Sequence, residues 1–230
     1  MESMMDIRAF SSEELWRDCI LIQIQNILNE RCRNLNSSDD SIRIILSGGN
    51  TPLPIYRRFN ELNIPWRKVN LWLADERSYP KGHPDRNETM VKEALGTGIL
   101  KLSEFHSFSS DNPEDMVKEY EVKLIGVSMF QLAILGIGED GHTASLFPGN
   151  ELGLSPEAPD LLAVYNSPKP PSERVSLSIK KINLSNHILF LVSGKSKQEI
   201  VDRVLKGEDL PATKVKGIKT TEMFFLTENQ

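Results

Sequence analysis

The chain has 230 residues, of which 39% are hydrophobic and 26% charged, a composition typical of a globular protein with a sizeable core. Its net charge is −5 and it contains no run of Lys and Arg, so we expect no nucleic-acid partner. It has neither a signal peptide nor an apolar run long enough to cross a bilayer, so we expect a cytoplasmic protein with no membrane partner.

Helical and strand patterns alternate from the first residues onward. Ser11 or Ser12 is a candidate N-cap for a helix that runs to about Asn34. Cys19 and Cys32 lie in this helix, about 20 Å apart along its axis, so they cannot pair and we expect reduced thiols. A polar loop over 36–40 follows. Up to residue 125 we then expect strands over 42–46, 69–74 and 104–108, and helices over 52–62, 87–95 and 113–125.

The second half of the chain is richer in strand patterns. We expect strands over 130–135, 161–165, 174–179, 187–192 and 222–226, a loop over 150–160, and a helix that begins near Gly194 and ends at Leu205. Strands that alternate with helices are typical of a mostly parallel, Rossmann-like sheet flanked by helices. We therefore predict an α/β fold in which residues 1–230 form one domain, as a monomer or a small homo-oligomer.

The strand over 130–135 runs into a turn that carries chemistry. Three glycines, Gly136, Gly138 and Gly141, remove side chains from this turn, and Asp140 and His142 project from it. In open α/β sheets, ligands bind at the carboxyl ends of the strands, where this turn lies. A His held in one tautomer by a carboxylate is suited to act as a general base near neutral pH.

Two other interpretations of the turn stay open at this point. The glycines spell G-x-G-x-x-G, the dinucleotide-binding pattern, but that pattern needs a helix directly after the turn. Glu139 and Asp140 would place carboxylates where the pyrophosphate binds, and Pro148 limits any helix that begins at Gly141 to about two turns. The alternative is a structural glycine turn with a solvated His142.

A second glycine-rich turn, Ser47-Gly48-Gly49-Asn50-Thr51-Pro52, follows the strand over 42–46. The two glycines let the backbone approach a ligand, and the hydroxyls of Ser47 and Thr51 supply further donors. With Thr51 as the N-cap and Pro52 at the first position, a helix N-terminus completes a cradle for one phosphate. The alternative is an ordinary capped turn.

Two basic residues are candidates to complete this cradle. Arg174 begins a predicted strand after the proline-stiffened stretch 168–171. Lys197 lies at the start of a predicted helix, where the helix dipole disfavours a cation unless an anion lies beside it. Taken singly, each is more often a surface charge.

Five motifs now stand in order along the chain. They are Ser47-Gly48-Gly49-Asn50-Thr51-Pro52, Asp75-Glu76-Arg77 with Pro80 and Asn87, the block over 136–148, Pro170-Pro171-Ser172-Glu173-Arg174, and Gly194-x-x-Lys197. In this order, the motifs resemble the 6-phosphogluconolactonase family from about residue 42 to about residue 213. The Asp-Gly-His-x-Ala-Ser-Leu-Phe-Pro block is the most specific of them.

The resemblance implies an α/β fold shared with glucosamine-6-phosphate deaminases. It implies hydrolysis of 6-phospho-D-glucono-1,5-lactone to 6-phosphogluconate, in the oxidative pentose phosphate pathway, without a metal or a cofactor. It implies that His142 matches a general base, that Arg77 matches an active-site arginine, and that Arg174, Lys197 and the loop from Gly48 to Thr51 match phosphate binders.

Lactone hydrolysis needs an activated water, a stabilised oxyanion and a proton for the ring oxygen. His142 is the candidate base and Arg77 the candidate for the oxyanion. Asp140 either orients the imidazole or contacts a sugar hydroxyl, and Asp75 either binds sugar hydroxyls or holds Arg77. We expect His142, Arg77 and the first glycine loop to meet in one cleft.

Some positions depart from the family pattern or keep an open role. Arg86 stands where a small residue is usual, and Asn50 where Ser is common; Arg86 either reaches the ligand or faces solvent. The roles of Lys195 and His83 are also open.

Two alternative functions remain on the same fold. An aminosugar-phosphate isomerase or deaminase would carry an acidic residue at the position of Phe147 and an aromatic residue at that of Arg77. A non-catalytic sugar-phosphate sensor would keep the phosphate cradle and lose the acid–base groups.

Overall fold

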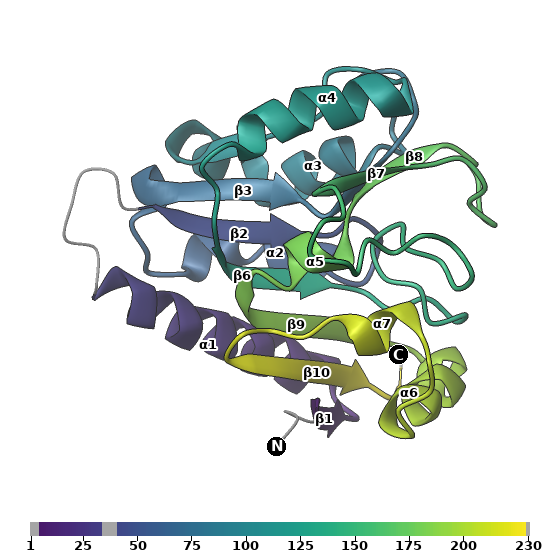
Figure 1. Cartoon of the computed structure of the whole chain (residues 1–230). Coiled ribbons are helices and arrows are strands. Elements are labelled where there is room, and N and C mark those ends of the chain that lie inside the picture. Colours follow the sequence, from purple (N-terminus) through teal and green to yellow (C-terminus); the bar gives the residue numbers. More distant parts are fainter. Residues whose placement is uncertain (1–4, 34–40, 229–230) are drawn as a thin grey trace.

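A computed structural model describes residues 5–33 and 41–228. Its main element is a seven-stranded sheet in which every neighbouring pair of strands is parallel, in the order β1-β10-β9-β6-β2-β3-β5 (Figure 1). The strands are β1 (Asp6–Phe10), β2 (Ile42–Leu46), β3 (Val69–Leu73), β5 (Glu104–His106), β6 (Phe130–Leu135), β9 (Ser185–Ser193) and β10 (Thr220–Leu226). The predicted parallel sheet is therefore confirmed.

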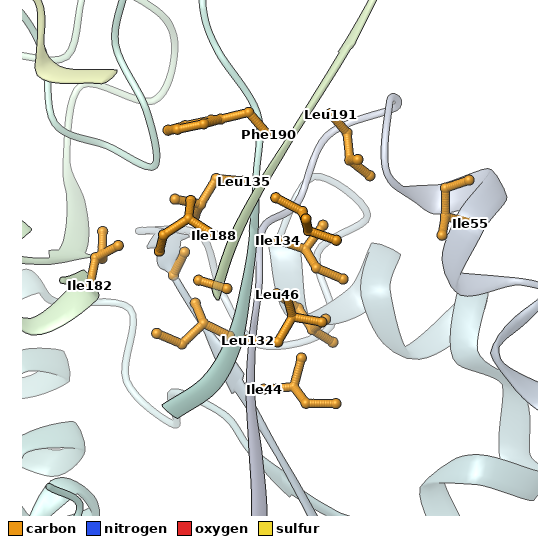
Figure 2. Packing of buried hydrophobic residues seen from close by; sticks show 14 of the residues in the cluster. Ile44, Leu46, Ile55, Leu132, Ile134, Leu135, Ile182, Ile188, Phe190 and Leu191 are labelled. Atoms are coloured by element: carbon orange, nitrogen blue, oxygen red, sulfur yellow. The ribbon is translucent and has the colours of Figure 1, made fainter. Parts of the chain in front are cut away.

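Helices cover both faces of this sheet, which explains why its central strands are mostly apolar. Every residue of β6 is buried, as expected for a parallel strand with helices on both sides. Figure 2 shows Ile188 of β9 on the side of Ile182, and Leu46 and Ile134 on the side of Ile55. The helices are α1 (Glu13–Cys32), α2 (Leu53–Tyr56), α3 (Asn87–Leu102), α4 (Pro113–Leu124), α5 (Ile179–Ile182), α6 (Gln198–Leu205) and α7 (Pro211–Lys214), with 3₁₀ turns at Phe59–Glu61, Trp66–Lys68 and Lys195–Lys197.

The order of the strands places a switch point between β2 and β6. On one side of this point lie β2, β3 and β5, and on the other side lie β6, β9, β10 and β1. Ligands bind in open α/β sheets in the crevice outside such a point, at the carboxyl ends of the strands. The two glycine-rich turns predicted to carry the site follow β2 and β6 directly.

A second, three-stranded antiparallel sheet was not expected from the sequence. It contains β4 (Asp75–Arg77), β8 (Arg174–Leu177) and β7 (Leu161–Val164), in the order β4-β8-β7. The strands expected over 161–165 and 174–179 exist, but they lie outside the parallel sheet. The connection between β7 and β8 is too short for a parallel crossover, so the two strands pair as a hairpin.

Three local predictions need correction and one lies outside the described residues. Strand β1 was missed, since it is an edge strand with three exposed residues that shows no buried run. Thr51 is not an N-cap: Pro52 occupies that position with no side-chain cap, and α2 is a single turn. Helix α3 continues past 95 across a kink at Gly96, where φ is 73°. The loop expected over 36–40 falls outside the described residues.

Other helix ends form as predicted. Ser12 caps α1 by accepting a hydrogen bond from the Leu15 amide at 3.3 Å, and Pro113 occupies the first turn of α4. Cys19 and Cys32 are free thiols. Over the two described ranges, each helix is too short or too polar to span a bilayer.

Candidate active site

A cleft of about 400 Å³ opens at the carboxyl ends of β2, β6 and β9. Of the predicted site residues, all but Asp140 line it: Ser47, Gly48, Gly49, Asn50, Thr51, Asp75, Arg77, His142, Arg174 and Lys197. The convergence expected of His142, Arg77 and the first glycine loop is therefore what the structure shows. Asn87, Ala144 and Lys169 line the same cleft, although they were not predicted to be site residues.

His142 is held in one orientation by the carboxylate two residues before it. Its Nδ1 hydrogen-bonds Asp140 Oδ1, and its backbone amide donates to the same oxygen at 3.2 Å. Because that carboxylate accepts, Nδ1 carries the proton and Nε2 keeps its lone pair. The imidazole also packs on the ring of Phe147, with 4.7 Å between the centroids. Asp140 therefore orients the imidazole, one of the two roles that the sequence left open.

Burial lowers the pKa of His142 below its ordinary value, while the neighbouring Asp140 carboxylate opposes this shift. The side chain is 16% exposed, so one part of the ring still reaches the cleft. A lowered pKa keeps the imidazole neutral at and below neutral pH. His142 can therefore accept a proton without first having to lose one when a ligand binds.

The turn that carries His142 depends on two of its glycines. A Cβ at Gly138 would lie 2.7 Å from Asp140 Oδ1 and closer still to the imidazole, and Gly141 has a φ of 87°. The Gly138 amide donates to the His142 carbonyl at 2.8 Å, which closes the turn. Over the described residues 141–149 no helix follows, so the dinucleotide interpretation, which requires one, is wrong.

Asp75 is buried at the base of the cleft, with partners other than Arg77. Its Oδ2 accepts from Ser145 Oγ at 2.6 Å, and its Oδ1 accepts from Asn87 Nδ2 at 3.0 Å. The Arg77 guanidinium instead donates from Nη1 to the carbonyl of Asp85 at 2.9 Å. Asp75 thus ties the His142 turn, through Ser145, to the first residue of α3.

The antiparallel sheet places two arginines side by side at the cleft. Arg77 of β4 is paired in register with Arg174 of β8. Arg174 is buried and donates to the carbonyls of Lys169, Pro170 and Pro171 at 3.0 to 3.1 Å, the last two joined by a cis peptide. Burial lowers its pKa below the ordinary value. Both guanidiniums line the cleft.

The first glycine loop and Lys197 line the same cleft. Gly48 packs against the side chain of Asn87 and leaves no room for a Cβ. The Ser47 hydroxyl is buried and has no hydrogen-bond partner among the described residues. Lys197 donates to the carbonyl of Ile137 at 3.1 Å, and burial lowers the pKa of its ammonium. These groups offer donors to a phosphate.

Comparison with known proteins places the chain in a family. The model of the Glucosamine-6-phosphate isomerases/6-phosphogluconolactonase family matches residues 17–224. The chain belongs to this family. A 6-phosphogluconolactonase of Thermotoga maritima is 32% identical over 202 residues, which cover 86% of this chain and 90% of that protein. One from Synechocystis is 31% identical, over 84% of this chain and 80% of the relative.

Solved structures agree with this assignment to the Glucosamine-6-phosphate isomerases/6-phosphogluconolactonase family. The crystal structure of the Thermotoga maritima 6-phosphogluconolactonase is similar with a TM-score of 0.84 at 29% sequence identity, covering 96% of this chain and 99% of that one. The fold and the family predicted from the sequence motifs are confirmed. Among the described residues, no group of three or more His, Cys, Asp or Glu is placed to hold a metal ion.

Three residues with open roles lie away from the cleft of this family member. Arg86 is fully buried, so it neither reaches a ligand nor faces solvent. His83 stacks on Tyr79 with 4.1 Å between the ring centroids. The Lys195 side chain is 80% exposed and pairs with Glu228 at 3.7 Å. Two of the cleft residues that were not predicted stood in segments that could have indicated them. Asn87 belongs to the motif that begins at Asp75, and Lys169 belongs to the proline-rich stretch 168–171.

Proposed function

We propose that this chain hydrolyses 6-phospho-D-glucono-1,5-lactone to 6-phosphogluconate, with His142 as the general base. The observation that carries the proposal is that His142, held by Asp140, and the Ser47–Pro52 loop line one cleft. The curated relatives of the same family that match most of this chain are 6-phosphogluconolactonases. A base and an anion cradle in one cleft suit a phosphorylated sugar ester.

The reaction begins with a water between His142 and the lactone carbonyl carbon. His142 Nε2 takes a proton from this water as its oxygen bonds to the carbon, a contribution of about 10²–10⁴-fold to the rate. Asp140 holds Nδ1–H in place and stabilises the imidazolium that forms. The ring starts neutral because burial lowers its pKa.

The second requirement is to stabilise charge on the carbonyl oxygen and then on the ring oxygen. Arg77 supplies the positive charge for the oxyanion, a contribution of several kcal/mol in typical sites. When the ring C–O bond breaks, the imidazolium of His142 returns its proton to the departing ring oxygen. The product is an open-chain carboxylic acid, and His142 is again a neutral base.

The substrate phosphate, at the end of the sugar away from the lactone carbonyl, fixes how the sugar lies in the cleft. The Ser47–Pro52 loop, Arg174 and Lys197 would bind it, and the buried Ser47 hydroxyl, which lacks a partner among the described residues, would find one there. Binding energy far from the reacting carbon is then used for orientation.

The two alternatives fit the cleft less well. A deaminase of this family needs an acidic side chain at position 147, where Phe147 is buried and packs on the His142 ring. A sensor needs no oriented base, yet Asp140 holds His142 by a direct hydrogen bond.

The test is a timed assay in which glucose-6-phosphate dehydrogenase generates the lactone and its disappearance is followed. We expect His142→Ala to lower kcat by about 10²–10⁴-fold with little change in KM. His187→Ala is the matched control, since His187 lies near the amino end of β9, outside the cleft. An unchanged kcat in His142→Ala would refute the base assignment. Ammonia release from glucosamine 6-phosphate would instead indicate the deaminase, and binding of 6-phosphogluconate without turnover the sensor.

A further inference from the structure

Two opposite charges lie fully buried next to the cleft, although neither lines it. The side chains of Glu76 and Arg86 are both 0% exposed, and 3.6 Å separates Arg86 Nε from Glu76 Oε2. Glu76 stands between the two cleft residues Asp75 and Arg77 in β4. Burying an ion pair gives little net stability, since two apolar side chains of similar size would serve as well or better. The pair therefore needs an explanation other than stability.

The Glu76 carboxylate joins β4 to the beginning of α3. Its Oε1 accepts from the amides of Arg77 and Asn87, each at 2.7 Å, and its Oε2 accepts from the amide of Glu88 at 2.8 Å. Two of these amides belong to the first turn of α3, where backbone N–H groups have no partner inside the helix. The carboxylate thus fixes the distance between the strand and the helix.

Arg86 fixes the loop that connects these two elements. Its guanidinium donates to the carbonyls of Tyr79 at 2.7 Å, Phe108 at 2.8 Å and Ser110 at 3.1 Å. The first carbonyl belongs to the loop after β4, and the other two belong to the segment that precedes α4. One buried side chain therefore links the loop after β4 to the segment before α4, which lies 22 to 24 positions beyond Arg86 along the chain.

The neighbours of Arg86 on both sides contact the site. The carbonyl of Asp85 accepts from Arg77 Nη1 at 2.9 Å. The side chain of Asn87 donates to both the carbonyl and Oδ1 of Asp75, and it packs against Gly48 of the phosphate loop. Any displacement of Arg86 is thus transmitted directly to Arg77 and to Asp75.

We propose that the buried Glu76–Arg86 pair positions Arg77 and Asp75 for lactone hydrolysis, and that Arg86 is a positioning residue that does not touch the substrate. This inference rests on the proposed function. The position of a buried charge is set by its partners on all sides, so the pair specifies one arrangement of the 75–87 segment. An apolar pair would leave the Arg77 guanidinium with several orientations.

The experiment combines Arg86→Met with Arg77→Met in a double-mutant cycle on kcat. We expect Arg86→Met alone to lower kcat about 10²-fold, with a smaller change in KM, because the oxyanion donor is misplaced. In the Arg77→Met background, Arg86→Met should lower kcat much less, since the donor that it positions is already gone. A purely structural role would give equal effects in both backgrounds.

Lys181→Met is the matched control. Lys181 is also buried, donates to the carbonyl of Val127 at 2.9 Å and pairs with Asp160 at 2.8 Å, but it does not line the cleft. It should lower the melting temperature and leave kcat unchanged. If Arg86→Met does not fold, Arg86→Lys, which keeps the positive charge but has a single ammonium in place of the planar guanidinium, replaces it in the same cycle.

The outcomes separate the two proposals. If Arg77→Met retains full kcat, the assignment of Arg77 in the proposed function is wrong. If Arg77→Met loses activity while a folded Arg86→Met keeps it, Arg86 is structural only and the inference is wrong. The same conclusion follows if Arg86→Met lowers kcat by the same factor with and without Arg77→Met.

Discussion

A single methyl group at position 138 tests the geometry around His142. A Cβ there would lie 2.7 Å from Asp140 Oδ1 and closer still to the imidazole, whereas ordinary contact begins at 3.4 Å. Gly138 has no positive φ, so alanine adds no backbone strain of its own. The imidazole has to retreat by about 1 Å or more, and a displacement of that size lowers kcat by about 10²-fold. This corresponds to about 2.7 kcal/mol in the activation free energy.

The assay is the timed disappearance of enzymatically generated lactone, measured together with the melting temperature of each variant. Gly98→Ala is the matched control, because Gly98 in α3 has open space around it and a φ that alanine accepts. Its kcat should equal that of the unchanged protein, and its stability should rise by about 0.5–1 kcal/mol. If Gly138→Ala also keeps full kcat, the imidazole either is not the base or tolerates displacement, and the reasoning fails.

Two further predictions concern the groups around the base and the phosphate. Because burial lowers the pKa of His142, kcat/KM should persist below the ordinary His pKa and fall only on further acidification. Asp140→Asn removes the carboxylate that raises this pKa, so the acid limb should move to lower pH while kcat falls by up to about 10²–10⁴-fold; an acid limb that moves to higher pH would contradict the assignment. Arg174→Ala and Lys197→Ala should chiefly raise KM for the phosphorylated lactone, and an unchanged preference over the unphosphorylated lactone would count against the cradle.

Much of the central sheet could be predicted because its strands are determined locally. Strand β6 is apolar except for Gln131 and is followed by a glycine, which is typical of a parallel strand buried on both faces. The turn after β6 carries Gly138 for a steric reason that acts within a few residues, because a Cβ there would meet Asp140 and His142. Local steric requirements of this kind can be predicted from the sequence.

The antiparallel sheet could not be predicted, because its pairing depends on contacts distant in sequence. The three residues of β4 form too short a run to show any periodicity, and they pair with β8 almost 100 positions later. The same pairing brings Arg77 opposite Arg174. From the sequence, Arg174 taken singly was more often a surface charge, and Arg77 was a candidate through the family resemblance.

Arg86 shows the limit of reasoning from residue type. Arginine is rarely buried without a partner, so the sequence suggested either a ligand contact or solvent. Its actual partners are three carbonyls and the carboxylates of Glu76 and Glu88, which come together only when the loop after β4, the segment before α4 and the start of α3 are folded. No short-range sequence pattern indicates that these segments come together around Arg86.

Backbone hydrogen bonds connect the parts of the site to each other directly. The amide of Ser47 donates to the carbonyl of Ile134 at 3.0 Å, which joins the phosphate loop to the strand that carries His142. The amide of Ala74 donates to Leu46 at 2.9 Å, and the carbonyl of Ala74 accepts from Leu177 of β8 at 2.8 Å. The base, the phosphate loop and the arginine-bearing sheet are therefore held together by strand ends rather than by long loops. Such a site is organised before substrate binds, so little binding energy has to be spent on ordering it.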